Sequence, residues 1–147
     1  MNGFILDTDH ITLYQAAHPI VQRRVNALDD TRLFVTIVSY QEQTAGWLAQ
    51  IQRAQTPIKT VRAYQWLQDT LNYFARQQVL SFDETAALYM QQFQQQRIRV
   101  GTRDLRIAAI ALANNCTVVT RNRRDFERVP GLSVVDWSVA EESPLTQ

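Results

Sequence analysis

Four acidic residues lie where they could form one catalytic site. Asp7 directly follows an apolar run, and Glu42 follows a β-branched run. Asp104 begins a segment with apolar residues at helical spacing, and Asp125 follows the short β-branched run Thr117–Thr120. Carboxylates held close together raise one another's pKa and destabilise the fold unless a cation offsets their charge. Mg²⁺ or Mn²⁺ suits oxygen ligands, so the pattern indicates a carboxylate cation site and hydrolysis by a water that the cation activates.

Each acid, taken singly, also has a structural explanation. Glu42 lies three residues after Ser39, which is the spacing of a helix capping box. Asp104 near a helix start is favoured by the helix dipole, and Asp125 could cap a short helical turn. Asp7 is the hardest to explain in this way, because an acid directly after an apolar run is expensive to bury. The functional interpretation therefore depends on all four acids converging at one place.

Alternating strand and helix patterns predict the elements that would bring the acids together. Strands are expected at residues 3–6, 33–38, 79–80, 117–120 and 134–135. Between them, apolar residues at helical spacing predict helices, with N-caps expected at Thr8 or Asp9, Ser39, Asp83 and Thr102. Strands that alternate with helices predict an α/β fold with a mostly parallel central sheet and helices on both faces. The carboxyl ends of its strands would carry the acids to one edge.

One long helix is expected at about residues 58–77. Its apolar stripe includes Val61, Tyr64, Leu71 and Phe74 and is expected to pack in the core. A contact with a partner or with a second copy of the chain is the alternative for this aromatic-rich face.

Length and composition limit the classes of protein that remain. The chain has 147 residues and a net charge of +1, so we expect one domain over residues 1–137 and a loose tail over 138–147. Cys116 is the single cysteine, which excludes an intramolecular disulfide and a cysteine-based zinc site. No stretch resembles a signal peptide or approaches the roughly 20 apolar residues of a membrane span. We therefore expect a cytoplasmic protein that does not associate with membranes.

Four motifs resemble those of PIN-domain proteins, in particular the VapC-type toxins of bacterial toxin–antitoxin pairs. They are FILDTDH, VSYQEQTAG, GTRDLRIAAIALA and VVTRNRRDFERVPGL, in family order and spanning nearly the whole chain. The resemblance implies a three-layer sandwich and a homodimer neutralised by a small antitoxin protein. It also implies a Mg²⁺- or Mn²⁺-dependent endoribonuclease whose cation is held by Asp7, Glu42, Asp104 and Asp125.

The resemblance also implies which residues support the acids. Thr120 and Asn122 match polar residues beside the fourth acid, and Thr8 lies next to the first. Asp9 stands where many members have Asn, so it either adds charge near the site or caps a helix. All four are expected to surround the cation ligands rather than to bind the cation.

Arginines gather around the last two acids. Eight of the fourteen lie between positions 97 and 128. The acids alone would repel RNA, whereas flanking guanidinium groups bind phosphates. The expected RNA-binding residues are Arg103, Arg106, Arg121, Arg123 and Arg124.

Two other functions remain open. The Asp7-Thr8-Asp9 sequence also resembles the motif of phosphatases that form an aspartyl phosphate, although the only lysine is Lys59 and a late paired-acid motif is missing. A PIN-like fold could instead be a non-catalytic binding module. That interpretation predicts the loss of one or more acids, and all four are present.

Overall fold

Five short strands form one parallel sheet. The computed structural model describes residues 3–140 of the chain. The strands are β1 (Gly3–Leu6), β2 (Leu33–Thr36), β3 (Val79–Leu80), β4 (Cys116–Val119) and β5 (Val134–Val135), in the spatial order β3-β2-β1-β4-β5. Every neighbouring pair is parallel, and β1 lies at the centre with Gly3 opposite Cys116 and Leu6 opposite Val119. The predicted α/β fold is confirmed, with a wholly parallel sheet.

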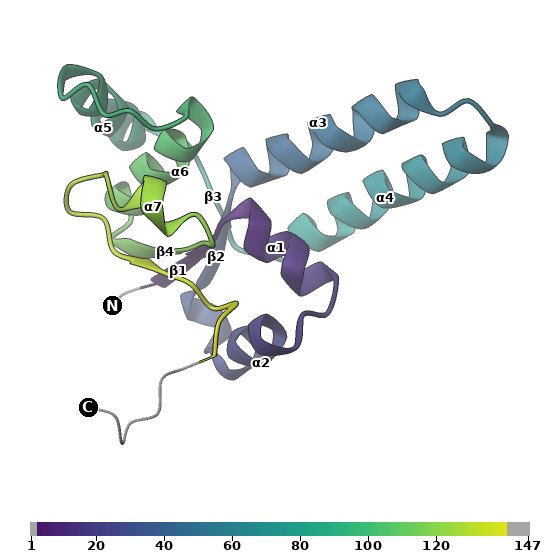
Figure 1. Cartoon of the computed structure of the whole chain (residues 1–147), viewed down its shortest axis with the longest axis horizontal. Helices are drawn as coiled ribbons and strands as arrows, with labels where there is room; N and C mark the ends of the chain where they lie inside the picture. The colour runs from purple at the N-terminus through teal and green to yellow at the C-terminus, as the bar shows by residue number, and fades with distance from the viewer. Residues whose placement is uncertain (1–2, 141–147) are drawn as a thin grey trace.

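Helices cover both faces of this sheet. They are α1 (Thr8–Gln15), α2 (Pro19–Ala27), α3 (Ile37–Arg53), α4 (Pro57–Ala75), α5 (Glu84–Gln95), α6 (Thr102–Ala113) and α7 (Arg123–Phe126), with a 3-10 turn at Asp30–Arg32. Figure 1 shows α5 and α6 on one side of the sheet and α2 on the other. Alternate residues of β1 face the two sides, so Ile5 packs in one apolar core with α6 and Leu6 packs in the other with α1 and α2.

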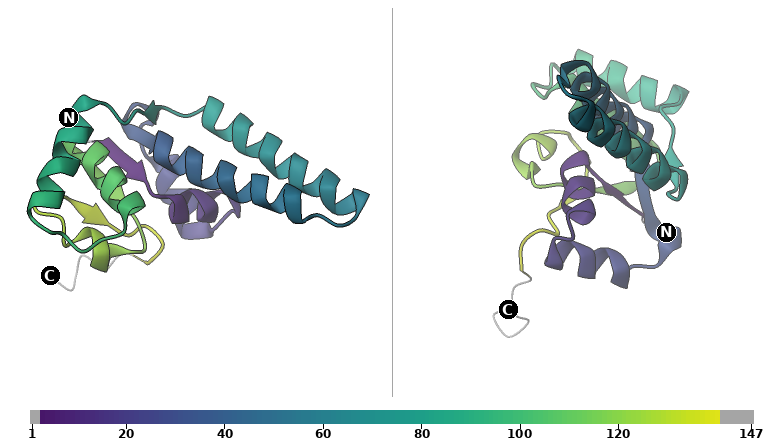
Figure 2. Two further views of the ribbon diagram at one scale, coloured as in Figure 1. Left: turned by 90° about the horizontal axis from the view of Figure 1, so that it is seen from above. Right: turned by 90° about the vertical axis from the view of Figure 1, so that its right-hand side faces the viewer.

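The helices α3 and α4 form a hairpin that projects beyond the sheet (Figures 1 and 2). Trp47 and Trp66 pack with their ring centroids 4.9 Å apart, and the indole Nε1–H of Trp47 donates to Thr70 Oγ1 at 2.7 Å. The expectation that the α4 apolar stripe lies in the core is wrong for most of its length, because Val61 is 63% exposed and Leu71 is 50% exposed. Only the end of the helix nearest the sheet reaches the core.

Three helix starts differ from the prediction. The N-cap of α1 is Asp7, whose carboxylate accepts the Thr8 N–H. Helix α3 begins at Ile37 because Thr36 accepts the Ser39 N–H at 3.2 Å. Helix α6 begins at Thr102 after Gly101, which has no side chain to cap it. The cap predicted at Asp83 is confirmed.

The strand and helix ends shift for related reasons. Strand β2 ends at Thr36 rather than at Val38, because Thr36 is the N-cap of α3 and the chain is helical from Ile37. Strand β4 spans Cys116–Val119, one residue earlier than predicted, and α4 ends at Ala75.

Residues 3–140 contain no helix that is long and apolar enough to cross a membrane. Most of the expected tail, residues 141–147, lies outside the described residues.

Candidate active site

The four predicted acids come from four different helices that meet at the carboxyl end of β1 and β4. Asp7 caps α1, Glu42 lies in the second turn of α3, Asp104 lies in the first turn of α6, and Asp125 lies in α7. The elements α1, α3, α6 and α7 are neighbours in this region (Figure 1). We call Asp7, Glu42, Asp104 and Asp125 the acid cluster.

Asp7 is the most deeply buried acid of the cluster. Its side chain is 7% exposed, and both of its oxygens accept hydrogen bonds, from the Thr8 N–H at 2.7 Å and from the Thr120 hydroxyl at 2.9 Å. Burial and the neighbouring Asp9 carboxylate raise the pKa of Asp7 to about 7, and Asp104 contributes to the rise. The fold thus holds a carboxyl group where its ionised form is unfavourable.

Asp104 and Asp125 are joined by one amide. Asn122 Nδ2 donates to Asp104 at 3.2 Å and to Asp125 at 3.0 Å. Burial raises the pKa of Asp104, and the Asp125 and Glu42 carboxylates raise it further. Asn122 was expected beside the fourth acid, and it lies between the last two.

Glu42 is bonded by side chains from two other helices. The Thr8 hydroxyl donates to it at 2.6 Å, and Arg103 forms an ion pair with it at 2.7 Å. The Thr8 hydroxyl also lies 3.0 Å from that of Ser39. The capping-box explanation for Glu42 is wrong, because Thr36 caps α3 and Glu42 points across to α1 and α6.

Asp9 binds the loop that follows β4. One oxygen accepts the Arg121 N–H at 3.0 Å and lies 3.4 Å from the Thr120 hydroxyl, and the other contacts His10 at 2.8 Å. Of the two alternatives expected for Asp9, the first is confirmed, because it adds charge beside Asp7. The second is wrong, because the cap of α1 is Asp7. The sequence leaves open whether His10 takes part in the site and favours a hydrogen-bonded helix residue, and the structure confirms such a residue in α1.

The five predicted RNA-binding arginines are all exposed. Arg103 pairs with Glu42, and Arg123 pairs with Glu127 at 3.0 Å within α7. Arg106 and Arg124 form no ion pair with another residue of the described part of the chain. Guanidinium groups beside the acid cluster are therefore available to a polyanion.

The acid cluster fits a hard divalent cation in donor type and in charge. It offers only carboxylate oxygens, and burial together with the neighbouring carboxylates raises the pKa of both Asp7 and Asp104, which a bound cation would offset. Within residues 3–140, no group of three acidic, histidine or cysteine side chains is already placed at metal-binding distances. Binding would therefore require Glu42 or its neighbours to reorient, and Arg103 would have to release Glu42.

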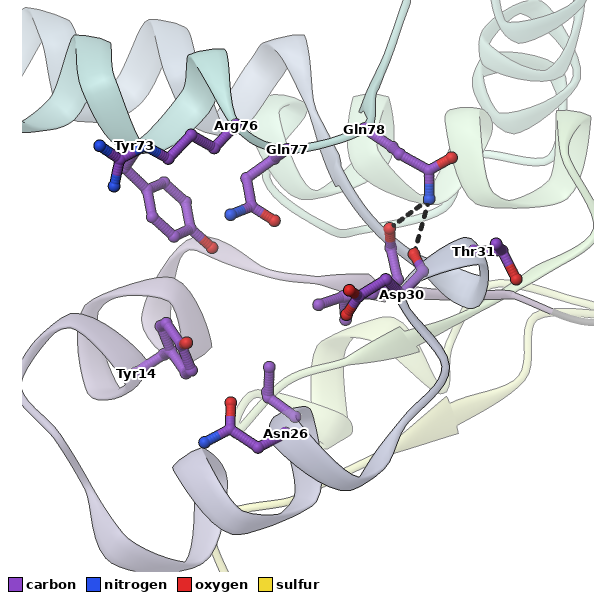
Figure 3. A pocket seen from close by; sticks show the side chains of 10 residues that line it. Tyr14, Asn26, Asp30, Thr31, Tyr73, Arg76, Gln77 and Gln78 are labelled. Carbon is purple, nitrogen blue, oxygen red and sulfur yellow. Dashed lines mark hydrogen bonds between the residues drawn. The ribbon is translucent and has the colours of Figure 1, made fainter.

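A separate polar pocket of about 340 Å³ lies at the opposite end of the sheet, before β2 and β3. Tyr14, Asn26, Tyr73 and Gln77 line it, and Gln78 donates to two backbone carbonyls at its edge (Figure 3). No member of the acid cluster lines this pocket. We place the chemistry at the cluster, because mutually repelling carboxylates are a more specific signal than a hollow of this size.

Known proteins resemble the chain over nearly its whole length. The PIN domain family matches residues 4–132. The tRNA(fMet)-specific endonuclease VapC of Salmonella typhimurium is 27% identical over 141 residues, which cover 93% of this chain and 99% of that protein. Ribonuclease VapC1 of Haemophilus influenzae is 27% identical over 139 residues, with 92% and 98% covered.

A solved structure agrees with these sequence matches. The crystal structure of DNA-bound VapBC from Salmonella typhimurium contains a chain that superimposes with a TM-score of 0.73 at 27% identity, covering 93% of this chain and 99% of that one. The family match includes all four acids and the strands from Phe4 in β1 to the end of β4. The chain therefore belongs to the PIN domain family.

Proposed function

We propose that this protein is a Mg²⁺- or Mn²⁺-dependent endoribonuclease and the toxin of a toxin–antitoxin pair. The observation that carries the proposal is the acid cluster itself, in which Asn122 joins two carboxylates while Asp7 and Glu42 approach from other helices. Such an arrangement costs stability and has no structural benefit that an amide or a hydroxyl would not supply. The full-length similarity to proteins named as VapC ribonucleases supports RNA as the substrate.

Each residue has a distinct part in the proposed reaction. Asp7, Asp104, Glu42 and Asp125 would hold the cation, which when bound supplies positive charge against a phosphate and makes water more acidic. Thr8 and Thr120 keep Glu42 and Asp7 oriented through hydrogen bonds of 2.6 and 2.9 Å. Arg103, released from Glu42, and the exposed Arg106, Arg121, Arg123 and Arg124 would bind the RNA backbone on either side.

The proposed partners follow from the solved relatives. The Salmonella relative is named as VapBC bound to DNA, and the Haemophilus influenzae structure is named as VapBC-1. We propose that this chain binds a small antitoxin, forms a homodimer and acts in the cytoplasm. The exposed apolar residues of the α3–α4 hairpin provide surface for such contacts.

The phosphatase alternative is disfavoured by the position of the only lysine. Aspartyl-phosphate chemistry needs a lysine near the phosphate, and Lys59 lies in the first turn of α4. The start of α4 is at the end of the hairpin that projects away from the sheet (Figure 1). The aspartyl-phosphate chemistry therefore lacks its lysine, and the late paired-acid motif is also missing.

The proposal is tested with purified protein, a mixed RNA pool and the variant Asp104→Asn. Cleavage should require Mg²⁺ or Mn²⁺ and stop in excess EDTA. The variant should cleave at least about 100-fold more slowly, because mutating even a residue that only hydrogen-bonds to a metal ligand lowers activity about 10- to 100-fold. Its melting temperature in EDTA should not fall, since the substitution removes a carboxylate whose ionised form is disfavoured by burial and by its acidic neighbours. Undiminished cleavage in EDTA would exclude the metal mechanism, and Mn²⁺ binding without any cleavage would favour the binding-module alternative.

A further inference from the structure

His10 is a fully buried polar residue whose two ring nitrogens are both bonded. Its side chain is 0% exposed, Nδ1 lies 2.8 Å from Asp9 Oδ1, and Nε2 accepts the Trp137 N–H at 3.2 Å. Because Nε2 accepts, the ring proton is on Nδ1 and is donated to Asp9. Asp136 also lies 3.4 Å from Nε2, but its Oδ1 is already bonded by the N–H and the hydroxyl of Ser138.

The bond from His10 fixes the orientation of Asp9. With one carboxylate oxygen on His10, the other faces the loop after β4, where it accepts the Arg121 N–H at 3.0 Å. The same oxygen lies 3.4 Å from the Thr120 hydroxyl. Asp9 thus connects α1 to this loop, which is distant in sequence.

The loop Thr120–Asn122 contacts three members of the acid cluster. The Thr120 hydroxyl donates to Asp7 at 2.9 Å and accepts the Asn122 N–H at 3.0 Å. The Asn122 side chain then donates to Asp104 and Asp125. A displacement of this loop would therefore move the hydrogen-bond donors of all three carboxylates.

We propose that His10 is a positioning residue of the active site. It acts through Asp9, which holds the Thr120–Asn122 loop, and it connects this loop to the backbone of Trp137, which is 127 residues away in sequence. The inference rests on the proposed function, since it concerns the geometry of that same acid cluster. Burying an imidazole costs free energy unless its nitrogens are hydrogen-bonded. The neighbouring residue Ile11, which is equally buried, shows that an alkyl side chain suffices where only packing is needed.

Two conservative variants separate the two bonds of His10. In His10→Asn the side-chain amide reaches the position of Nδ1, so the donor to Asp9 is kept and the acceptor for Trp137 is lost. In His10→Gln the longer side chain reaches the position of Nε2, so the acceptor is kept and the donor to Asp9 is lost. Gln is closer to His in volume, so if His10 served packing alone, His10→Gln should resemble wild type more closely than His10→Asn. If His10 is a positioning residue, His10→Asn should resemble wild type more closely than His10→Gln.

The first measurement is hydrogen exchange at the Arg121 amide in metal-free protein. We expect His10→Gln to exchange about tenfold faster than wild type and His10→Asn to remain close to it, because local opening governs exchange. The second measurement is Mn²⁺ affinity by calorimetry. His10→Gln should bind Mn²⁺ about tenfold more weakly than wild type, because losing a residue that orients metal ligands typically costs about tenfold or more in affinity. His10→Asn should bind within about threefold of wild type, because its bond to Asp9 is kept.

The outcomes distinguish this inference from the proposed function. If wild type binds Mn²⁺ and cleaves RNA while both variants match each other in exchange and affinity, His10 is not a positioning residue and the proposed function stands. Faster exchange in His10→Gln with unchanged Mn²⁺ affinity would likewise overturn the inference. If wild type binds no Mn²⁺, the proposed function fails first, and the positioning role in a cation site falls with it.

Discussion

Asp7 meets two opposing physical demands. As the N-cap of α1 it accepts a backbone N–H, which favours its ionised form. Burial and the Asp9 carboxylate oppose ionisation more strongly, so its pKa is about 7 instead of the ordinary 3.8. The pKa of Asp7 therefore lies close to neutral pH, where the carboxyl group is present in both its protonated and its ionised form. A cation in the cluster would favour the ionised form.

The raised pKa predicts that metal-free protein loses stability as the pH rises. Between about pH 4 and about pH 7, folded Asp7 keeps a proton that the unfolded chain has released, so folding is favoured at the acid end of this range. The free energy of unfolding should fall by at most about 4 kcal/mol across it through this group. Urea titrations in EDTA at about pH 5 and about pH 8 measure the difference.

The matched control for this prediction is Asp7→Asn. The amide cannot titrate, so the variant should show a smaller fall in stability over the same range. Added Mg²⁺ should stabilise wild type more at about pH 8 than at about pH 5, because protons compete with the cation for carboxylates. Equal pH dependence in wild type and variant would contradict the assignment of the effect to Asp7.

At the scale of elements, the α3–α4 hairpin is held together by contacts of its own. Its two tryptophans stack, and the only hydrogen bond between side chains of the two helices within the described residues is that from Trp47 to Thr70. Thr70 is 3% exposed, so its hydroxyl would lack a partner if the indole N–H were removed. The hairpin depends on this pair because its apolar outer surface lies in solvent.

A double-mutant cycle at Trp47 and Thr70 tests this dependence. Trp47→Phe should lower the free energy of unfolding by roughly 1–3 kcal/mol, because it leaves the buried Thr70 hydroxyl without its partner. Thr70→Val should cost less, because the Trp47 N–H that it leaves unpaired is only half-buried. The double variant should lose less than the sum of the single losses. RNA cleavage should stay within about twofold of wild type, because the pair lies away from the acid cluster; additive losses would argue that the bond does not form.

The helices and strands also show which features of the fold a sequence pattern can predict. The order and type of all five strands and of the six longer helices follow from hydrophobic periodicity. Three of the acids follow strands, and Asp104 was identified at the start of a helix. The periodicity of α4 identified an apolar face but not what covers it, so Val61 was placed in the core. The contacts of Glu42 with Arg103 and of His10 with Trp137 join residues far apart in sequence, and no local pattern encodes them.

At the scale of the whole molecule, charge is distributed unevenly although the net charge is only +1. The arginines of the last third of the chain are exposed, and two of them, Arg103 and Arg128, form ion pairs with the acid cluster at Glu42 and Asp125. The acids repel RNA and the arginines attract it, so binding should be strongly dependent on salt. The balance between the two sets controls how closely a phosphate can approach the cluster.

This arrangement predicts the salt dependence of RNA binding. Arg106→Gln and Arg124→Gln should each weaken binding of a short single-stranded RNA and reduce the slope of log affinity against log salt by about 0.7. Fluorescence anisotropy in EDTA measures the slope without cleavage. Arg62→Gln is the control, because Arg62 is exposed on the projecting hairpin. A slope change as large in the control would indicate binding to the net charge of the protein.

The central place of β1 between β2 and β4 has a consequence for the cell that makes this protein. Asp7 is synthesised 113 residues before its bonded partner Thr120, and β1 lacks one of its two neighbours until β4 has been synthesised. The acid cluster therefore cannot assemble until the chain from Asp7 to Asp125 is available to fold. Nascent chains that stop short of β4 should be inactive, however early the first of the four acids is made.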